Sequence, residues 1–214
     1  MLETHKIKEL YKKIQNKLFY MVPEKWDKLC LHASVIEQIK SVLTGELYFY
    51  YFPKGILKKD PINVYEIPNR FNINEDTYLE QIRELYNLIK ELWEEFLLFN
   101  VRRWYSINII MENFKFKIEY HYEDIRELPY NQEQLHVIWK YEYLGISLES
   151  FSKKNRKLIE QYLDKNIEKE QETYEEGVYK RPAHHIISYE KIKDQEEEKK
   201  EEIQNMNQIL AKKS

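Results

Sequence analysis

Histidine is the residue type whose positions in this chain first suggest chemistry. His184 and His185 are adjacent, so their side chains diverge on a helix and point to opposite faces of a strand. The pair lacks the four-residue spacing of an HExxH zinc site, and no Glu or Cys stands at ligand spacing beside it. We therefore interpret these residues as an exposed polar pair and expect no metal site.

His121 is the second histidine with candidate chemistry, because it stands between Glu119 and Glu123 on the polar side of an alternating segment. A histidine beside carboxylates could serve as a general base if a nucleophile or a substrate pocket lay within reach. The sequence pattern reveals neither of these, so it favours a solvent-facing strand surface.

Nucleophile and phosphate-binding patterns are missing. Four glycines are too few and too scattered to form GxGxxG, GxxxxGK[ST] or GxSxG. Cys30 is the single cysteine, so an intrachain disulfide is impossible, and its leucine neighbours predict a buried, inert thiol. Acidic pairs such as Glu94-Glu95 recur too often for any one of them to indicate an acid/base dyad. These patterns predict a protein that is not an enzyme and holds no cofactor.

The composition limits the partners that this chain can have. Its formal net charge is only -3, whereas a generic nucleic-acid binder is usually basic. Hydrophobic residues make up 43% of the chain and aromatic residues 14%, enough for a sizeable core. The N-terminus lacks the apolar run of a signal peptide, and no segment approaches the ~18 apolar residues of a membrane span. We expect a soluble, cytoplasmic protein without direct nucleic-acid or membrane partners.

The hydrophobic periodicity predicts an α+β fold, with an antiparallel sheet of about five strands packed with helices. The expected elements are a helix at 7–21, strands at 28–36, 46–52 and 62–67, a helix from Asn74 to about Phe99, strands at 105–111 and 114–122, and helices at 131–145 and from 152. Segments 39–45 and 69–76 are expected to be turns or loops. Glu112-Asn113 should join the last two strands into an antiparallel hairpin.

The composition changes near residue 165. Residues 166–214 are rich in Glu and Lys, and their apolar residues are too sparse for an independent core. The chain therefore divides into an α+β domain at 1–165 and a charged extension at 166–214. We expect the extension to be partly helical, or ordered only against a partner.

Several blocks of sequence occur in the order found in one known family. They are MVPEKWDK, ELYFYYF, IPNRFNINEDTYLEQIRELY, FKFKIEYHYEDI and IWKYEYLGI. In these blocks, residues 1–165 resemble the YezG/EsaG-like immunity proteins of type VII secretion systems. The resemblance implies a cytoplasmic antitoxin that binds a secreted nuclease (DNase) toxin and blocks it stoichiometrically. It carries over no catalytic residues.

This resemblance leads to a hypothesis about the binding surface. An acidic, aromatic face would suit the positively charged groove with which a nuclease holds phosphates. The candidate partner-binding residues are Glu119, Tyr120, His121, Tyr122, Glu123, Asp124 and Glu142. Two alternatives stay open: a secretion chaperone or adaptor that acts through the charged extension, and an enzyme built around His121 and nearby acids.

Overall fold

A computed structural model describes residues 4–37, 43–55, 60–98, 103–113, 115–175 and 184–190. The helices in these ranges are α1 (His5–Met21), α2 (Ile67–Phe71), α3 (Glu75–Leu98), α4 (Gln132–Leu144) and α5 (Lys153–Glu175), with short 3-10 turns η1 (Val64–Glu66) and η2 (Leu148–Ser150). The strands are β1 (Trp26–Ser34), β2 (Ile36–Glu37), β3 (Leu43–Thr44), β4 (Leu47–Pro53), β5 (Ile62–Asn63), β6 (Ser106–Glu112), β7 (Lys115–His121) and β8 (His184–Glu190).

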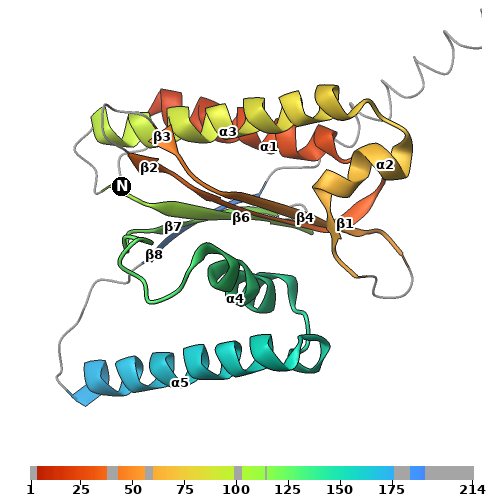
Figure 1. Cartoon of the computed structure of the whole chain (residues 1–214). Coiled ribbons are helices and arrows are strands. Elements are labelled where there is room, and N and C mark those ends of the chain that lie inside the picture. Colours follow the sequence, from red (N-terminus) through yellow and green to blue (C-terminus); the bar gives the residue numbers. More distant parts are fainter. Residues whose placement is uncertain are drawn as a thin grey trace, which may run out of the picture.

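The strands form one antiparallel sheet in the order β5-β4-β1-β6-β7-β8, beside a small β2-β3 ladder. Helices α1 and α3 lie together on one face of the sheet (Figure 1). Helix α4 lies on the other face, and α5 lies beyond α4. The predicted α+β class is therefore confirmed, and β8 brings the sheet to six strands instead of about five.

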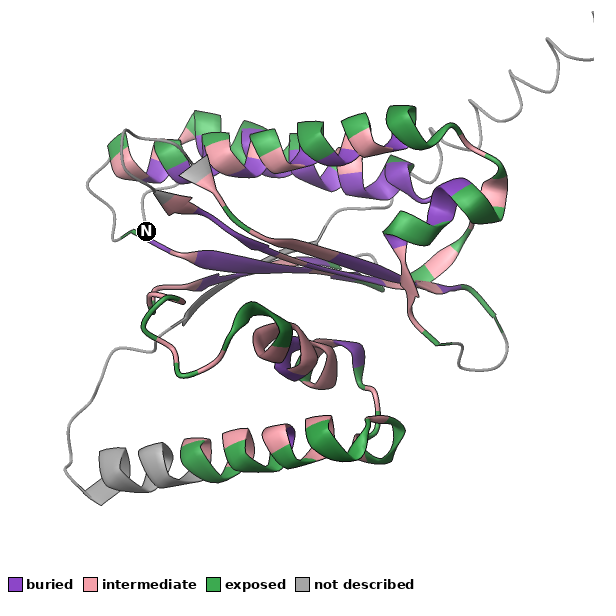
Figure 2. Cartoon of the chain, in the orientation of Figure 1, coloured by how far each residue is buried: buried purple, intermediate pink, exposed green. Residues whose placement is uncertain are grey.

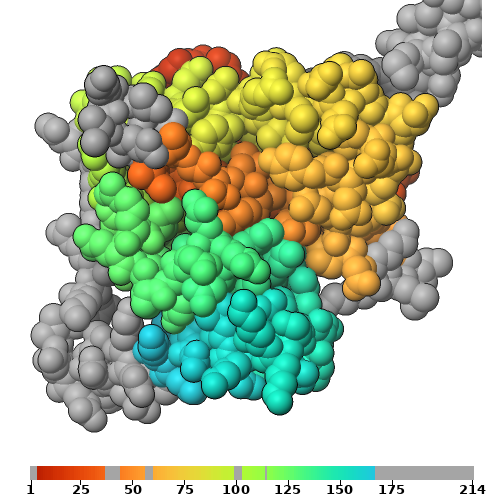
Figure 3. Space-filling model, viewed as in Figure 1, coloured from red at the N-terminus to blue at the C-terminus, as the bar shows by residue number. Residues whose placement is uncertain are grey.

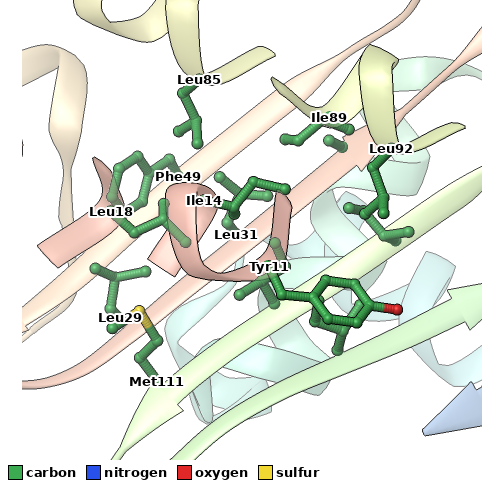
Figure 4. Packing of buried hydrophobic residues seen from close by; sticks show 14 of the residues in the cluster. Tyr11, Ile14, Leu18, Leu29, Leu31, Phe49, Leu85, Ile89, Leu92 and Met111 are labelled. Carbon is green, nitrogen blue, oxygen red and sulfur yellow. The ribbon is translucent and has the colours of Figure 1, made fainter. Parts of the chain in front are cut away.

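The main core lies between the sheet and the α1/α3 layer. Apolar residues recur every three or four positions along both helices, so each helix turns one buried stripe toward the strands. Leu29 and Leu31 of β1 meet Ile14 and Leu18 of α1 in this layer, and all four side chains are fully buried (Figure 4). Burial is concentrated in this layer, whereas α4 and α5 are mostly half-buried or exposed (Figure 2).

The opposite face of the sheet has a much smaller apolar cluster. It comprises Cys30, Tyr50, Trp139 and Leu144, with partly buried aromatic residues around it. The alternation of β1 explains the division, because Leu29, Leu31 and Ala33 face the main core while Cys30 faces α4. Helix α4 is thus held to the sheet by few apolar contacts.

Local capping signals in the sequence are confirmed. The Asn74 side chain accepts a hydrogen bond from the backbone N–H of Thr77 at 2.9 Å and begins α3. Asn131 and Gln134 form a reciprocal capping box at the start of α4, and Gly145 ends that helix at φ 61°. Asn113, at φ 51°, turns the chain between β6 and β7.

The strand predicted at 62–67 is wrong over most of its length. β5 ends at Asn63, because the Asn63 side chain accepts the backbone N–H of Tyr65 at 3.1 Å and starts the turn η1. Helix α2 (Ile67–Phe71) follows, beginning at the last residue of the predicted strand and continuing into the segment at 69–76 that was predicted to be turn-like. Pro68 sits in its first turn, where a missing N–H costs no helical hydrogen bond. The prediction of a loop at 39–45 is wrong at its end, since Leu43–Thr44 is a short strand that pairs with β2.

The predicted division at residue 165 falls inside a helix. Helix α5 continues across that position to Glu175. β8 pairs with β7 along seven residues, from Lys115 with Glu190 to His121 with His184. These two elements place part of the charged extension beside the domain, and the domain boundary itself stays a prediction. Among the described helices, none is long and apolar enough to cross a membrane.

Gly45 provides a test of packing between β3 and β4. A Cβ atom there would lie 1.9 Å from the Ser34 carbonyl oxygen and 2.5 Å from the Tyr86 hydroxyl. That hydroxyl already donates a hydrogen bond to the same carbonyl at 2.9 Å. We expect Gly45→Ala to lower the free energy of unfolding by about 2 kcal/mol, measured by urea denaturation.

Gly145→Ala is the matched control for this substitution. Its Cβ would meet no atom within 4 Å, so only the positive φ of 61° opposes it. We expect a smaller loss of about 1 kcal/mol. Wild-type stability in Gly45→Ala would contradict the close approach at Ser34.

Candidate functional site

A cavity of about 480 Å³ lies under the sheet, between its strands and helices α4 and α5. Polar side chains from six parts of the chain line it: His32 and Ser34 of β1, Glu46 and Tyr48 near β4, Ser106 and Asn108 of β6, His121 and Glu123 at the end of β7, Trp139, Glu142 and Tyr143 of α4, and Tyr162 and Lys165 of α5. On the surface seen in Figure 3, the green α4 region lies between orange residues of the sheet and blue-green α5.

Asn108 is the centre of a hydrogen-bond network that joins the sheet to α4. Its Oδ1 accepts the indole N–H of Trp139 at 2.9 Å and lies 2.8 Å from Nδ1 of His32. Its Nδ2 lies 2.7 Å from Nε2 of His121. An indole nitrogen can only donate, so it fixes the orientation of the Asn108 amide. His32 must then donate from Nδ1, and Nε2 of His121 must accept, which requires a neutral His121.

A stack of three rings adds a second connection between the sheet and α4. The ring of Tyr48 lies 5.2 Å from that of His32 and 3.9 Å from that of His136, with nearly parallel planes. The hydroxyl of Tyr50 lies 3.2 Å from Nε2 of His136. Burial lowers the pKa of both histidines to about 4. Both rings are therefore neutral at pH 7.

Glu119 is buried, so the prediction of a solvent-facing side for β7 is wrong. The carboxylate accepts the hydroxyl of Tyr143 at 2.8 Å and pairs with Lys117, and only 8% of the residue is exposed. Burial opposes ionisation of Glu119, but hydrogen bonds from Lys117 and Tyr143 outweigh it and hold its pKa below the usual value. Helix α4 covers this face of β7, and Glu119 contacts the helix through the hydroxyl of Tyr143.

The other candidates on or next to β7 are divided between the two faces of the sheet. Tyr120 is fully buried in the main core, where its hydroxyl donates to that of Tyr11 at 2.8 Å. Tyr122 is partly buried against the same core. A partner cannot touch the Tyr120 side chain while the domain is folded. His121 lies on the opposite face, within the Asn108 network.

The three remaining candidates are acidic and differ in how far their charge is compensated. Asp124 pairs with Arg126, whose hydrogen bonds hold the pKa of Asp124 below its usual value. Glu123 and Glu142 are exposed and line the cavity. Glu142 is exposed as a residue, but the packing around its carboxylate partly desolvates it and raises its pKa, although it accepts a hydrogen bond from Tyr162. The structure thus brings Glu123, Glu142 and His121 together around one cavity.

Two buried polar residues of β6 were not predicted from the sequence: Asn108, the centre of the network, and Ser106, which lines the cavity. Asn108 is 3% exposed and stands between two isoleucines, and Ser106 is 4% exposed and begins the strand. A polar residue on an otherwise apolar strand was the available signal, but alternation does not identify what covers it. Glu46 was also missed, because it precedes β4 and is distant in sequence from the other acids.

The enzyme and metal interpretations gain no support from this site. Within the described ranges, no three His, Cys, Asp or Glu residues are placed to hold a metal ion. The side chains of His184 and His185 lie outside the described ones. Cys30 is fully buried, as predicted, and burial raises the pKa of its thiol to about 12. Such a thiol is a poor nucleophile at neutral pH.

Comparison with known proteins identifies relatives along most of the chain. A family model described as "Immunity protein YezG-like" matches residues 7–160. The immunity protein YezG of Bacillus spizizenii is 30% identical over 166 residues, which cover 77% of this chain and 98% of the relative. YezG of Bacillus subtilis is 28% identical over 141 residues, covering 65% and 89% respectively.

A third relative comes from another genus. The type VII secretion system protein EsaG of Staphylococcus aureus is 28% identical over 166 residues, covering 76% of this chain and 97% of the relative. The match of the family model spans the main core, the sheet from β1 to β7, α4 and the start of α5, and it ends before β8. The chain belongs to the YezG-like family of immunity proteins.

Proposed function

We propose that this protein binds a cognate secreted nuclease (DNase) toxin of a type VII secretion system and neutralises it by occlusion. Family membership supports an immunity role, and one relative, EsaG, is named as a protein of the type VII secretion system. The proposed mechanism is stoichiometric binding, in which this protein makes and breaks no covalent bonds.

One observation carries the choice of a nuclease as the partner. Glu46, Glu123 and Glu142 line one cavity, whereas Lys165 is the only lysine or arginine that the described part of the chain contributes to its lining. A nuclease binds phosphates through positively charged residues, and complementary charge accelerates association and disfavours wrong partners. These three glutamates form the acidic rim of the cavity, which is therefore a suitable surface to cover such a groove.

The direct test is a titration of nuclease activity. Purified protein is added to the nuclease domain encoded beside it, and the rate of DNA degradation is measured. We expect activity to fall linearly and to reach zero at one equivalent, because each molecule occludes one active site. Loss of activity at far lower ratios, or DNA degradation by this protein alone, would contradict occlusion.

Charge reversal at the rim tests the binding surface. We expect Glu123→Lys combined with Glu142→Lys to weaken toxin binding at least 100-fold, because two attractive contacts become repulsive. Both residues are exposed, and neither forms an ion pair with another described residue, so the core should stay folded, although Glu142→Lys loses the hydrogen bond from Tyr162 of α5. Affinity is measured by calorimetry and folding by circular dichroism.

The matched control reverses two exposed charges on the far side of the sheet. Glu80→Lys with Glu94→Lys on α3 makes the same change in net charge. Equal weakening by both double variants would indicate a general effect of net charge and would exclude the rim as the binding surface.

A secretion chaperone or adaptor is the second candidate, because the relative EsaG is named as a type VII secretion system protein. Such a protein would act through the charged extension. A chain truncated after Glu175 keeps α5 whole and separates the two functions. Full inhibition by the truncated chain supports the immunity role. Binding without inhibition by the complete chain supports the chaperone.

A further inference from the structure

We propose that the cavity between the sheet and α4 receives an arginine side chain of the toxin. This inference rests on the proposed function and deepens it, because it names the chemical group that the site binds. Four properties of the cavity support it: its charge, its shape, its aromatic walls and one hydroxyl in its lining.

The charge of the cavity favours a cation. Glu46, Glu123 and Glu142 all contribute to the lining. Among the residues that the structure describes, no lysine or arginine lies within ion-pairing distance of any of these three carboxylates. Lys165 instead places its ammonium 5.7 Å from the centre of the Tyr130 ring. Negative charge in the cavity is thus left for a ligand to balance.

The volume and walls suit a long, flat cation. A volume of about 480 Å³ lies within the ~300–1,000 Å³ range typical of ligand pockets. The rings of Trp139 and Tyr143 stack at 5.7 Å with planes 20° apart, and Tyr48 lies 5.8 Å from Trp139. A guanidinium is planar and stacks on aromatic faces, whereas a lysine ammonium is a compact, strongly hydrated charge. The walls therefore favour arginine over lysine.

Ser106 supplies an independent indication of a polar ligand. Only 4% of this residue is exposed, and it lines the cavity on the same face of β6 as Asn108. Its hydroxyl has no hydrogen-bond partner within the described part of the chain. A hydroxyl that faces the cavity and makes no hydrogen bond there can accept an N–H of a guanidinium.

The test uses N-acetyl-arginine amide as the probe and the indole N–H of Trp139 as the reporter. The two-dimensional 1H-15N NMR spectrum of the full chain is recorded during titration, and Trp139→Phe assigns the signal among the four tryptophans. We expect a saturable shift of the Trp139 signal at millimolar probe. N-acetyl-citrulline amide has nearly the same shape without the charge, and it should bind at least tenfold more weakly.

Two double variants, in which glutamine replaces glutamate, test whether the carboxylates of the cavity bind the probe. Glu123→Gln with Glu142→Gln should weaken the arginine probe at least tenfold, whereas Glu80→Gln with Glu94→Gln on α3 should leave it unchanged. Glutamine at 142 keeps an oxygen that can accept the Tyr162 hydroxyl, so the contact between α4 and α5 is retained. Equal binding of both probes, no shift of Trp139, or unchanged binding in the rim variant would overturn the proposal.

The outcome separates this inference from the proposed function. If the toxin is neutralised but the arginine probe does not bind, the cavity proposal fails and the immunity role stands. If the probe binds but no nuclease is inhibited, the proposed function fails and the cation site stands.

Discussion

Lowering the pH from 7 to 4.5 is expected to destabilise the contact between α4 and the sheet. The folded protein holds the pKa of His32 and His136 near 4, against about 6.5 when unfolded, so folding favours their neutral forms. This stabilisation is complete above pH 6.5 and is lost as the pH falls toward 4, because the unfolded chain binds more protons in that window. The loss should reach about 2–4 kcal/mol, allowing for partial exposure of both rings.

Urea denaturation at several pH values measures this effect, and His136→Phe provides the control. Phenylalanine keeps a ring against Tyr48 but cannot bind a proton, so it should reduce the pH dependence by about half. The raised pKa of Glu142 stabilises the folded protein as the pH falls and so opposes this loss. The wild-type protein and His136→Phe both contain Glu142, so the comparison between them is unaffected. Stability that does not change between pH 6.5 and 4.5 would contradict the neutral network around Asn108.

Trp139→Ala is expected to detach α4 while the rest of the domain stays folded. Trp139 is 5% exposed, belongs to a cluster with only three other buried residues, and donates the hydrogen bond that orients Asn108. Removing a buried tryptophan costs about 3–5 kcal/mol, which exceeds what so small a cluster can tolerate. Hydrogen exchange should show lost protection in α4, with protection of α3 and β1 unchanged.

Trp104→Ala is the comparison for this variant. Trp104 is fully buried in the main core, where it contacts Phe96 and Tyr120. Its loss should destabilise all elements together, so that hydrogen exchange becomes faster throughout the domain. If Trp139→Ala also unfolded α3, the two layers of the molecule would form a single cooperative unit, and the expected local detachment would be wrong.

Elements encoded by local signals were predictable from the sequence. Periodic apolar residues located α1 and α3, alternation located β1, β6 and β7, and the Asn131 and Gly145 caps bounded α4. The error at 62–67 arose where Asn63 competes with strand pairing through its own side chain. Pattern alone favours a strand there, and a single side chain-to-backbone hydrogen bond decides against it.

The cavity could not be predicted in the same way, because its residues come from distant parts of the chain. Alternation places Glu119 and His121 on one face of β7, but it does not reveal that α4 covers that face. Asn108 looks like an ordinary surface residue until Trp139, which is 31 residues away, reaches it. Predicting the site required knowing how α4 docks, and that depends on many weak tertiary contacts.

The unequal faces of the sheet bear on how this protein can diversify. The α1/α3 layer holds most of the buried apolar residues, whereas the face under α4 has one cluster of four buried residues and a polar network. Substitutions around the cavity should therefore disturb the α4 layer and leave the main core intact. Under the proposed function, binding specificity can change beneath the sheet while the scaffold above it is kept.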